Sequence, residues 1–303
     1  MALPFVLITG GSGLIGRALT SSLLSEGYRV AVLTRRPDRY RRRPGENVEL
    51  YSQLGNIPEE VPISVVVNLA GARIVGARWS EGRKRILRES RIALTESLVE
   101  WMLGRTHLPS ALISGSAVGY YGDTGDAVVD EETRCGEDFG AVLCRDWEAA
   151  TEPAVIGGVR VVCLRTGLVL SREGGMLPPM SNSFRLGLGA QLGNGRQWMS
   201  WIHIDDHIGA VRHLISSQES AGAYNLTAPA PVTNRDFSDS LARALRRPRI
   251  FTAPSSVLRI LLGESAELLL GGQRALPSRL QREGFAFHYS NISVALQNLF
   301  AGR

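Results

Sequence analysis

The chain has 303 residues, is 44% hydrophobic and contains 33 glycines, which is enough for one large domain or for a domain with a small lobe. Its formal net charge is +5, and arginine supplies all but one of its 34 basic residues. Because the arginines are spread along the chain, we expect no nucleic-acid partner, and no apolar run is long enough to span a membrane.

Two features predict an intracellular protein in a reducing compartment, with the cytoplasm as the expected location. The first buried strand begins at residue 4 or 5, so we expect no signal or transit peptide. The cysteines, Cys135, Cys144 and Cys163, are odd in number and lack the spacing of metal ligands. We therefore expect reduced thiols and no metal site.

The segment Phe5 to Gly16 predicts a dinucleotide site. Phe5 to Ile8 is a strand buried on both faces, and an amphipathic helix follows the glycines. Gly10 permits a tight turn, Gly13 lets a pyrophosphate approach the backbone, and Gly16 lets the helix pack against the strand. The first amides of the helix then face an anion. A purely structural turn is the alternative. The residues expected to contact the cofactor here are Gly10, Ser12, Gly13, Leu14, Ile15 and Gly16.

The end of the next strand, Arg29 to Thr34, favours NADP over NAD. NAD-binding proteins usually place Asp or Glu there to hold the ribose 2′-hydroxyl. Here Thr34 is followed by Arg35 and Arg36, whose guanidinium groups suit a 2′-phosphate. A solvated basic loop is the alternative, because more arginines follow at Arg39, Arg41, Arg42 and Arg43.

Further buried strands bring small residues to the same edge of a parallel sheet. A short strand is expected near residues 48–51, a buried one at 64–69 and another at 111–114. Small residues at these carboxyl ends let a ligand lie against the backbone. We expect the cofactor to contact Asn68, Leu69, Ala70, Gly71, Ser114 and Gly115.

A long helix is expected at about residues 80–103, and Arg91 falls inside its apolar stripe. A charged group among core positions needs a partner, so Arg91 is a candidate for a cofactor or substrate phosphate. The alternative is an arginine that extends its head group to the edge of the core. The apolar positions of the stripe are Leu87, Leu94, Leu98 and Met102.

The remaining elements complete the predicted architecture. A helix at 141–152 ends at Pro153, and a strand at 159–164 is followed by Arg165, a further candidate for the cofactor site. Beyond these we expect a strand at 198–204, a helix at 206–215 with an acidic cap, a strand at 224–226, and helices at 233–245 and 292–300. Alternating strands and helices predict an α/β doubly wound (Rossmann) sheet over residues 1–170, with sheet-completing segments from 198–230, and a small, mostly helical lobe over residues 171–303.

Several motifs together resemble the extended short-chain dehydrogenase/reductase superfamily, whose best-known members are sugar-nucleotide epimerases. A narrower resemblance is to proteins described only as "epimerase family", which carry a short C-terminal domain of unknown function. That resemblance implies an NADP-dependent oxidoreductase or epimerase. The motifs are the glycine segment 9–16, Asn68-Leu69-Ala70-Gly71, the segment 114–122, the segment 164–170, Ile202-His203-Ile204-Asp205-Asp206, and the segment 272–278.

One feature departs from the superfamily pattern. Its members normally carry Tyr-x-x-x-Lys, in which the lysine lowers the tyrosine pKa so that a phenolate can accept a proton. The matching positions here are Gly140 and Cys144. The only lysine is Lys84, and Ser80 lies four residues before it, so the chain contains no Tyr-x-x-x-Lys.

The resemblance implies roles for the residues that remain. Ser116 would hold the substrate oxygen, and Tyr121 or Tyr120 would donate the proton. The alternatives are a strand-end serine bonded to the backbone and two tyrosines that pack a loop. The substrate is an unknown small hydroxyl or carbonyl compound, possibly linked to a nucleotide.

Because the dyad is missing, a weakly active or inactive NADP(H)-binding sensor is the second hypothesis. Its ligand state would alter a partner surface. The substrate, the direction of reaction and the oligomeric state stay open.

Overall fold

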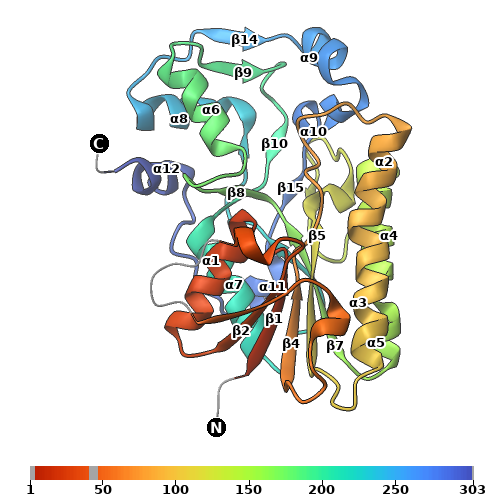
Figure 1. The fold of residues 1–303 in the computed structure, drawn as a ribbon. Coiled ribbons are helices and arrows are strands. Elements are labelled where there is room, and N and C mark those ends of the chain that lie inside the picture. Colours follow the sequence, from red (N-terminus) through yellow and green to blue (C-terminus); the bar gives the residue numbers. More distant parts are fainter. Residues whose placement is uncertain (1–3, 41–46, 302–303) are drawn as a thin grey trace.

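The computed structural model describes residues 4–40 and 47–301. At the centre of the molecule is a seven-stranded parallel sheet with the order β12-β7-β5-β4-β1-β2-β3 (Figure 1). The chain runs outward from β1 to β3 and returns to β4 on the other side of β1, so the strand order reverses between β1 and β4. Open α/β sheets bind ligands beside such a reversal. The strands are β1 (Phe5–Thr9), β2 (Arg29–Leu33), β3 (Val48–Tyr51), β4 (Ile63–Asn68), β5 (Ala111–Ala117), β7 (Arg160–Thr166) and β12 (Gly222–Leu226).

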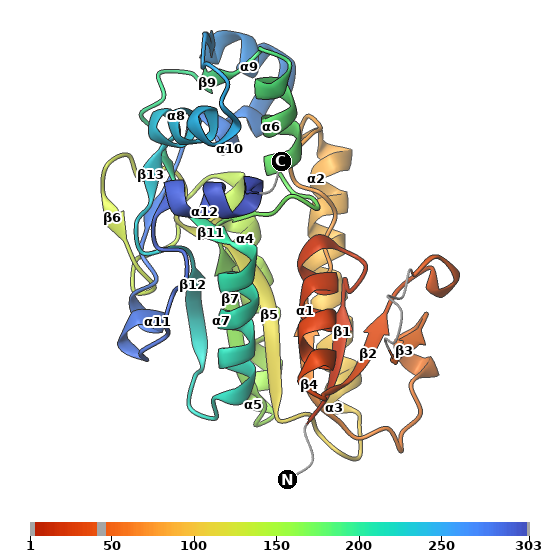
Figure 2. The ribbon, with the colours of Figure 1, turned by 90° about the vertical axis from the view of Figure 1, so that its left-hand side faces the viewer.

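Helices cover both faces of the sheet, which confirms the predicted doubly wound fold (Figure 2). Alternate side chains of β1 point to opposite faces. Val6 and Ile8 share a core with Leu19 and Val211, whereas Leu7 packs on the other face. One face carries α1 (Leu14–Ser25) and α7 (Ile204–Ser216), and the other carries α2 (Glu81–Arg88), α3 (Leu94–Leu103), α4 (Phe139–Ala149) and α5 (Glu152–Ile156).

Several predicted boundaries were wrong, for local physical reasons. Pro153 does not end a helix but lies in the first turn of α5, where a missing amide costs nothing. The helix α7 begins at Ile204, because the imidazole of His203 caps it by accepting a hydrogen bond from the amide of Asp205. The strand β5 continues through Ala117, so Ser114 and Ser116 lie in the strand.

The expected helix at 80–103 is divided. A π-helical turn, η3 (Glu89–Ala93), separates α2 from α3 and contains Arg91. Turns of this kind are frequent at functional sites because they displace a side chain from the regular helical register. Ser80 caps α2 by accepting a hydrogen bond from the amide of Arg83.

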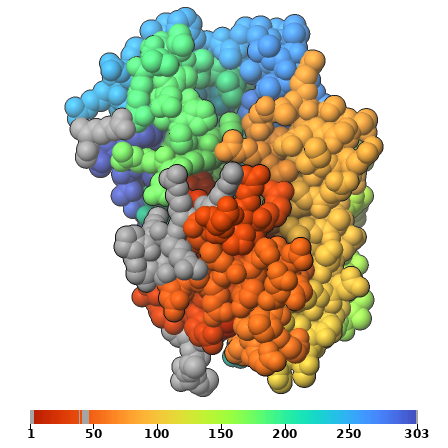
Figure 3. All heavy atoms as spheres, in the orientation of Figure 1, coloured from red at the N-terminus to blue at the C-terminus, as the bar shows by residue number. Residues whose placement is uncertain are grey.

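The C-terminal lobe lies over the carboxyl ends of the strands (Figure 1), and its green and blue atoms form the top of the molecule in Figure 3. Its core includes Phe184, Trp201, Phe237 and Leu296. The helices predicted at 233–245 and 292–300 have the expected bounds, except that Thr233 is the cap residue of the first. The helices of this part of the chain are α6 (Leu177–Arg185), α8 (Asn234–Leu245), α9 (Ser255–Leu262), α10 (Glu267–Leu270), α11 (Ser278–Arg282) and α12 (Ile292–Phe300).

Four two-stranded sheets lie outside the central sheet in the described part of the chain. The expected strand at 198–204 is two strands, one of which pairs with β8 in parallel. No helix in the described part of the chain is long and apolar enough to cross a membrane. The short strands are β6 (Val128–Val129), β8 (Leu168–Leu170), β9 (Ala190–Leu192), β10 (Trp198–Met199), β11 (Trp201–His203), β13 (Val232–Thr233), β14 (Phe251–Ala253) and β15 (Arg274–Ala275).

Candidate functional site

The glycine turn joins β1 to α1 at the strand reversal. Gly10 has a φ of +69°, and a Cβ atom there would lie 2.7 Å from the carbonyl carbon of Leu69. A Cβ atom on Gly16 would lie 2.4 Å from the carbonyl oxygen of Gly10. Gly13 precedes α1, and no side chain caps this helix. The amides of Leu14 and the residues after it therefore lie at an uncapped helix start, where an anion is stabilised.

The end of β4 is held by a buried set of polar groups. Thr9 Oγ1 donates to Asn68 Oδ1 at 2.7 Å, and the amide of Ala70 donates to Thr9 Oγ1 at 3.2 Å. Asn68 Nδ2 donates to Thr95 Oγ1 at 2.8 Å and lies 3.5 Å from Ser114 Oγ. The Asn68 side chain thus organises the strand ends, and the backbone of residues 69–71 is the part placed beside the glycine turn.

Arg35 and Arg36 follow β2 at the same edge of the sheet and are exposed. Within residues 4–40 and 47–301, neither guanidinium group has a hydrogen-bond or ion-pair partner. The side chain of Thr34 accepts a hydrogen bond from the amide of Arg36 at 3.4 Å, which shapes the turn. The two cations are thus available to a ligand. Arg41, Arg42 and Arg43 of the predicted basic loop lie outside the described residues.

Arg91 lies beneath the segment that follows β4. Its guanidinium group donates to the carbonyl oxygen of Ala72 at 2.9 Å and lies 5.3 Å from the ring centroid of Trp147. A Cβ atom on Gly71 would lie 3.2 Å from its Cζ atom. Burial lowers the Arg91 pKa from its ordinary value. This cation therefore supports the backbone of residues 71–72.

A buried polar network occupies the ends of β5 and β7. The Ser116 hydroxyl donates to Glu148 Oε1 at 2.6 Å. Arg165 donates to both carboxylate oxygens of Glu148, each at 2.9 Å, and only 5% of Arg165 is exposed. Burial alone would lower the Arg165 pKa, but the hydrogen bonds and the charge of Glu148 outweigh it and raise the pKa. The arginine expected at the cofactor is thus engaged by a carboxylate.

The tyrosines lie beside this network in the 3-10 helix η4 (Val118–Tyr121). Tyr121 is buried, donates to Asn225 Oδ1 at 2.8 Å and accepts from Arg165 at 3.1 Å. Burial raises the Tyr121 pKa to about 12, and burial also raises the Tyr120 pKa. The Arg165 guanidinium lies 3.5 Å from the centroid of the Tyr120 ring. Neither phenol has the lowered pKa that a phenolate base needs.

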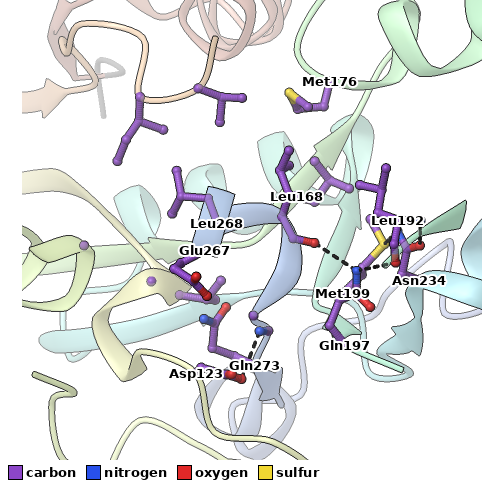
Figure 4. Close-up of a pocket in the computed structure, with 18 of the residues that line it drawn as sticks. Asp123, Leu168, Met176, Leu192, Gln197, Met199, Asn234, Glu267, Leu268 and Gln273 are labelled. Carbon is purple, nitrogen blue, oxygen red and sulfur yellow. Dashed lines mark hydrogen bonds between the residues drawn. The ribbon is translucent and has the colours of Figure 1, made fainter. Parts of the chain in front are cut away.

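A cavity of about 640 Å³ opens between the end of β5, α4 and the C-terminal lobe (Figure 4). Ala117, which follows Ser116, lines it, as do Val118 and Gly119. Neither Tyr120, Tyr121 nor the Ser116 side chain is among its lining residues in the described part of the chain. The segment after β4 reaches it through Ile74 and Val75. The cavity is thus lined in part by residues that follow shortly after the predicted cofactor contacts on β4 and β5.

The two positions that match the missing dyad also line this cavity. Gly140 and Cys144 lie on α4, one turn apart. Burial raises the Cys144 pKa to about 12, so this thiol stays protonated at neutral pH. Glu148 lies one further turn along the same face of α4. The sequence analysis did not identify Glu148. Its spacing of four residues from Cys144, and of eight from Gly140, could have indicated that it lies on the same face of the helix.

An uncapped glycine turn at the strand reversal of a doubly wound sheet is the geometry of Rossmann-type dinucleotide-binding folds. The family model described as "NAD dependent epimerase/dehydratase family" matches residues 6–227, so the chain belongs to this family. A model described as "Domain of unknown function (DUF1731)" matches residues 253–299. The resemblance stated from the motifs is confirmed.

Curated relatives span the whole chain. "Epimerase family protein Mb2239" of Mycobacterium bovis is 46% identical over 301 residues, which cover 98% of this chain and 97% of the relative. "Epimerase family protein SSP1921" of Staphylococcus saprophyticus is 37% identical and covers 97% of this chain and 98% of the relative. Neither name states a substrate.

Two solved structures share the fold across the chain. Human epimerase family protein SDR39U1 (isoform 2), determined with NADPH, has a TM-score of 0.87 at 31% identity and covers 98% of this chain and 99% of its own. A nucleoside-diphosphate sugar epimerase from Corynebacterium glutamicum has a TM-score of 0.78 at 35% identity and covers 98% of this chain and 58% of its own.

Proposed function

We propose that the protein binds NADP(H) along the ends of β1, β2 and β4 and uses it to oxidise or reduce a small hydroxyl or carbonyl compound. The observation that carries this proposal is the uncapped start of α1 at the same sheet edge as Arg35 and Arg36, which are exposed and have no partner among the described residues. A pyrophosphate at the helix start and a 2′-phosphate at the arginines would supply the missing anions. The NADPH in the human relative supports this choice.

The cofactor preference can be tested by titration calorimetry with NADPH and NADH. We expect NADPH to bind more tightly, and Arg35→Glu to weaken NADPH binding by about 1–3 kcal/mol, the scale of a lost charge-assisted hydrogen bond. Arg282→Glu makes the same charge change on an exposed residue of α11 and should leave the affinity unchanged. Equal affinities of the unaltered protein for both cofactors would refute the assignment.

When bound, NADPH supplies a hydride at the nicotinamide. The chain's own groups would position the substrate and move a proton. Ser116, next to the cavity residue Ala117, is the proposed contact to the substrate oxygen. Its hydroxyl donates to Glu148, which Arg165 holds in place. Tyr120 and Tyr121 stay the candidate proton donors, with protonated phenols at neutral pH.

Turnover should be slow, because an activated acid–base group typically contributes about 10²–10⁴-fold. Consumption of NADPH with carbonyl substrates should be measured for Ser116→Ala, Tyr120→Phe and Tyr121→Phe. Loss of activity with unchanged NADPH affinity in one tyrosine variant would identify the donor. If all three variants retain full activity, the proposed site is misplaced.

The second candidate function is an NADP(H) sensor with little or no turnover. The observation that favours it is that the polar groups at the ends of β5 and β7, Ser116, Glu148 and Arg165, are already bonded to one another. A sensor should show NADPH-dependent thermal stabilisation and a changed partner interaction without any substrate turnover. Turnover of a carbonyl substrate would exclude it.

A further inference from the structure

We propose that the 640 Å³ cavity takes an uncharged, predominantly apolar carbonyl compound, such as a fused-ring ketone, and not a sugar nucleotide. This inference rests on the proposed function, in that NADPH must bind beside the cavity for reduction to follow. It goes further by assigning the chemical class of the substrate from the groups that line the cavity.

The lining is apolar on most sides. Three methionines, Met176, Met180 and Met199, line the cavity together with Leu168 and Leu268. Figure 4 shows Met176 and Leu168 on the side of α6 and β8, with Leu268 facing them from α10. Methionine side chains adapt to irregular apolar shapes, and burial of apolar surface stabilises binding by roughly 25 cal/mol per Å². Such a wall favours rings or alkyl chains over hydroxylated sugars.

The charges at the cavity have the wrong sign for a diphosphate. Four carboxylates, Asp123, Asp138, Glu264 and Glu267, line it at exposed positions, and no Lys, Arg or His in the described part of the chain does. Two of the carboxylates pair with cations: Lys84 Nζ lies 2.6 Å from Glu264 Oε2, and Arg259 Nε lies 3.1 Å from Glu267 Oε1. An anionic ligand would be repelled by these carboxylates. Diphosphates are normally held by Arg, Lys or helix starts.

The helix start at the cavity is also occupied. Asp138 Oδ1 accepts a hydrogen bond from the amide of Ala141 at 2.9 Å and so caps α4. A phosphate would have to displace this carboxylate to use the first turn of α4. The uncapped start of α1, by contrast, belongs to the proposed cofactor site.

The amide side chains at the cavity are used within the protein. Gln273 donates to the carbonyl oxygen of Gly122, Gln197 donates to the carbonyl oxygens of Leu192 and Leu269, and Asn234 Oδ1 accepts from the amide of Leu192 at 2.8 Å. These amides shape the surrounding loops. A hydroxylated ligand would have to compete with the protein for these three amides, which weakens the exchange of its water hydrogen bonds on entry.

The reaction for this substrate class is a carbonyl reduction. The carbonyl carbon accepts a hydride, its oxygen accepts a proton that derives from solvent, the C=O group becomes CH–OH, and NADPH is oxidised to NADP⁺. No further oxidant or reductant is required.

The test compares ligands on the full chain saturated with NADP⁺. Trp79 and Trp198 line the cavity, so tryptophan emission reports occupancy, and calorimetry checks it. The ligands are 1-decalone, a saturated steroid 3-ketone, decalin-2-carboxylate and UDP-glucose. We expect at least one ketone to bind at least tenfold more tightly than UDP-glucose, and the carboxylate, which shares the decalone skeleton, to bind at least tenfold more weakly than decalone.

Matched variants locate the binding. Met176→Asp should weaken ketone binding at least tenfold, Met176→Leu should retain it, and Ile156→Asp, on the exposed surface of α5, should leave it unchanged. Unchanged NADPH affinity in Met176→Asp serves as the folding control. If UDP-glucose binds more tightly than both ketones, or if no ketone binds while NADPH does, the substrate inference is overturned and the NADP assignment stands. Failure of NADPH to bind would refute the proposed function itself.

Discussion

The two ends of the strand edge differ in how their polar groups are satisfied. At β1 and β2, the start of α1 has no capping side chain and Arg35 and Arg36 have no partner among the described residues. At β5 and β7, Ser116, Glu148 and Arg165 bond to one another in a buried cluster. Unsatisfied donors indicate a place for a ligand, whereas a completed network indicates a structural role or a site that has to reorganise.

The buried network and the positions that match the missing Tyr-x-x-x-Lys lie on the same helix, α4. The tyrosine and lysine of the superfamily would project from α4 at the positions of Gly140 and Cys144, where the chain leaves room for the cavity. One turn later, Glu148 anchors Ser116 through a hydrogen bond. On this helix the carboxylate of Glu148 forms a buried ion pair with Arg165.

The largest expected effect comes from disrupting the buried network at the ends of β5 and β7. Glu148→Ala leaves the Arg165 guanidinium buried without its carboxylate, and loss of one partner of a buried pair costs about 3–5 kcal/mol of unfolding free energy. Asp146→Ala, on the same helix, removes a more exposed partner of Arg88 and should cost about 0–1 kcal/mol. Urea denaturation measures the free energy of unfolding of both variants. Similar decreases would contradict the larger contribution that we assign to the buried network.

A pH titration of stability tests the burial of His207, whose Nε2 lies 3.2 Å from Thr166 Oγ1 at the end of β7. His207 is buried on α7, and burial lowers its pKa from 6.5 to about 4. Between these values the unfolded chain binds a proton that the folded chain does not, so stability falls as the pH drops from 6.5 to 4. At 1.36 kcal/mol per pKa unit, the loss is about 3 kcal/mol.

His207→Gln should remove this component of the pH dependence, and His107→Gln, at an exposed position, should leave it in place. Denaturant midpoints measured from pH 7 to pH 4 compare the three proteins. A wild-type profile in His207→Gln would show that another group is responsible.

A single methyl group added at the glycine turn between β1 and α1 tests the proposed cofactor site. Gly10→Ala places a Cβ atom against the backbone of Leu69 at a φ of +69°, a conformation that costs about 1–3 kcal/mol in other residues. We expect NADPH affinity to fall roughly 10–100-fold. Gly55→Ala, where an added Cβ atom meets nothing within 4 Å, is the control. Calorimetry that finds equal affinities would argue against cofactor contact at the turn.

The smallest effect separates a structural tyrosine from a catalytic one. Tyr121→Phe removes hydrogen bonds to Asn225 and Arg165 and should cost about 1 kcal/mol of stability, as such bonds usually do. If the hydroxyl is only structural, turnover should change little. A stable variant without turnover would instead make Tyr121 the proton donor.

The sequence by itself determined the elements whose signals are local. The four apolar residues and three glycines at 5–16 predicted β1, its turn and α1. The β3 bounds and the α12 bounds followed from short-range patterns. These signals work because a cap, a glycine φ or an apolar period is decided by neighbours within a few residues.

Only the tertiary structure decided what the candidate site contains. Ser116, Glu148 and Arg165 come from β5, α4 and β7, and nothing local pairs them. The cavity joins Ile74 to Gln273 across most of the chain, and its charge balance appears only when α10 and the lobe are packed over β5. The burial and the hydrogen bonds of Tyr121 and Arg165 are likewise set by the packing of β7, β12 and α4, and no local pattern indicates them.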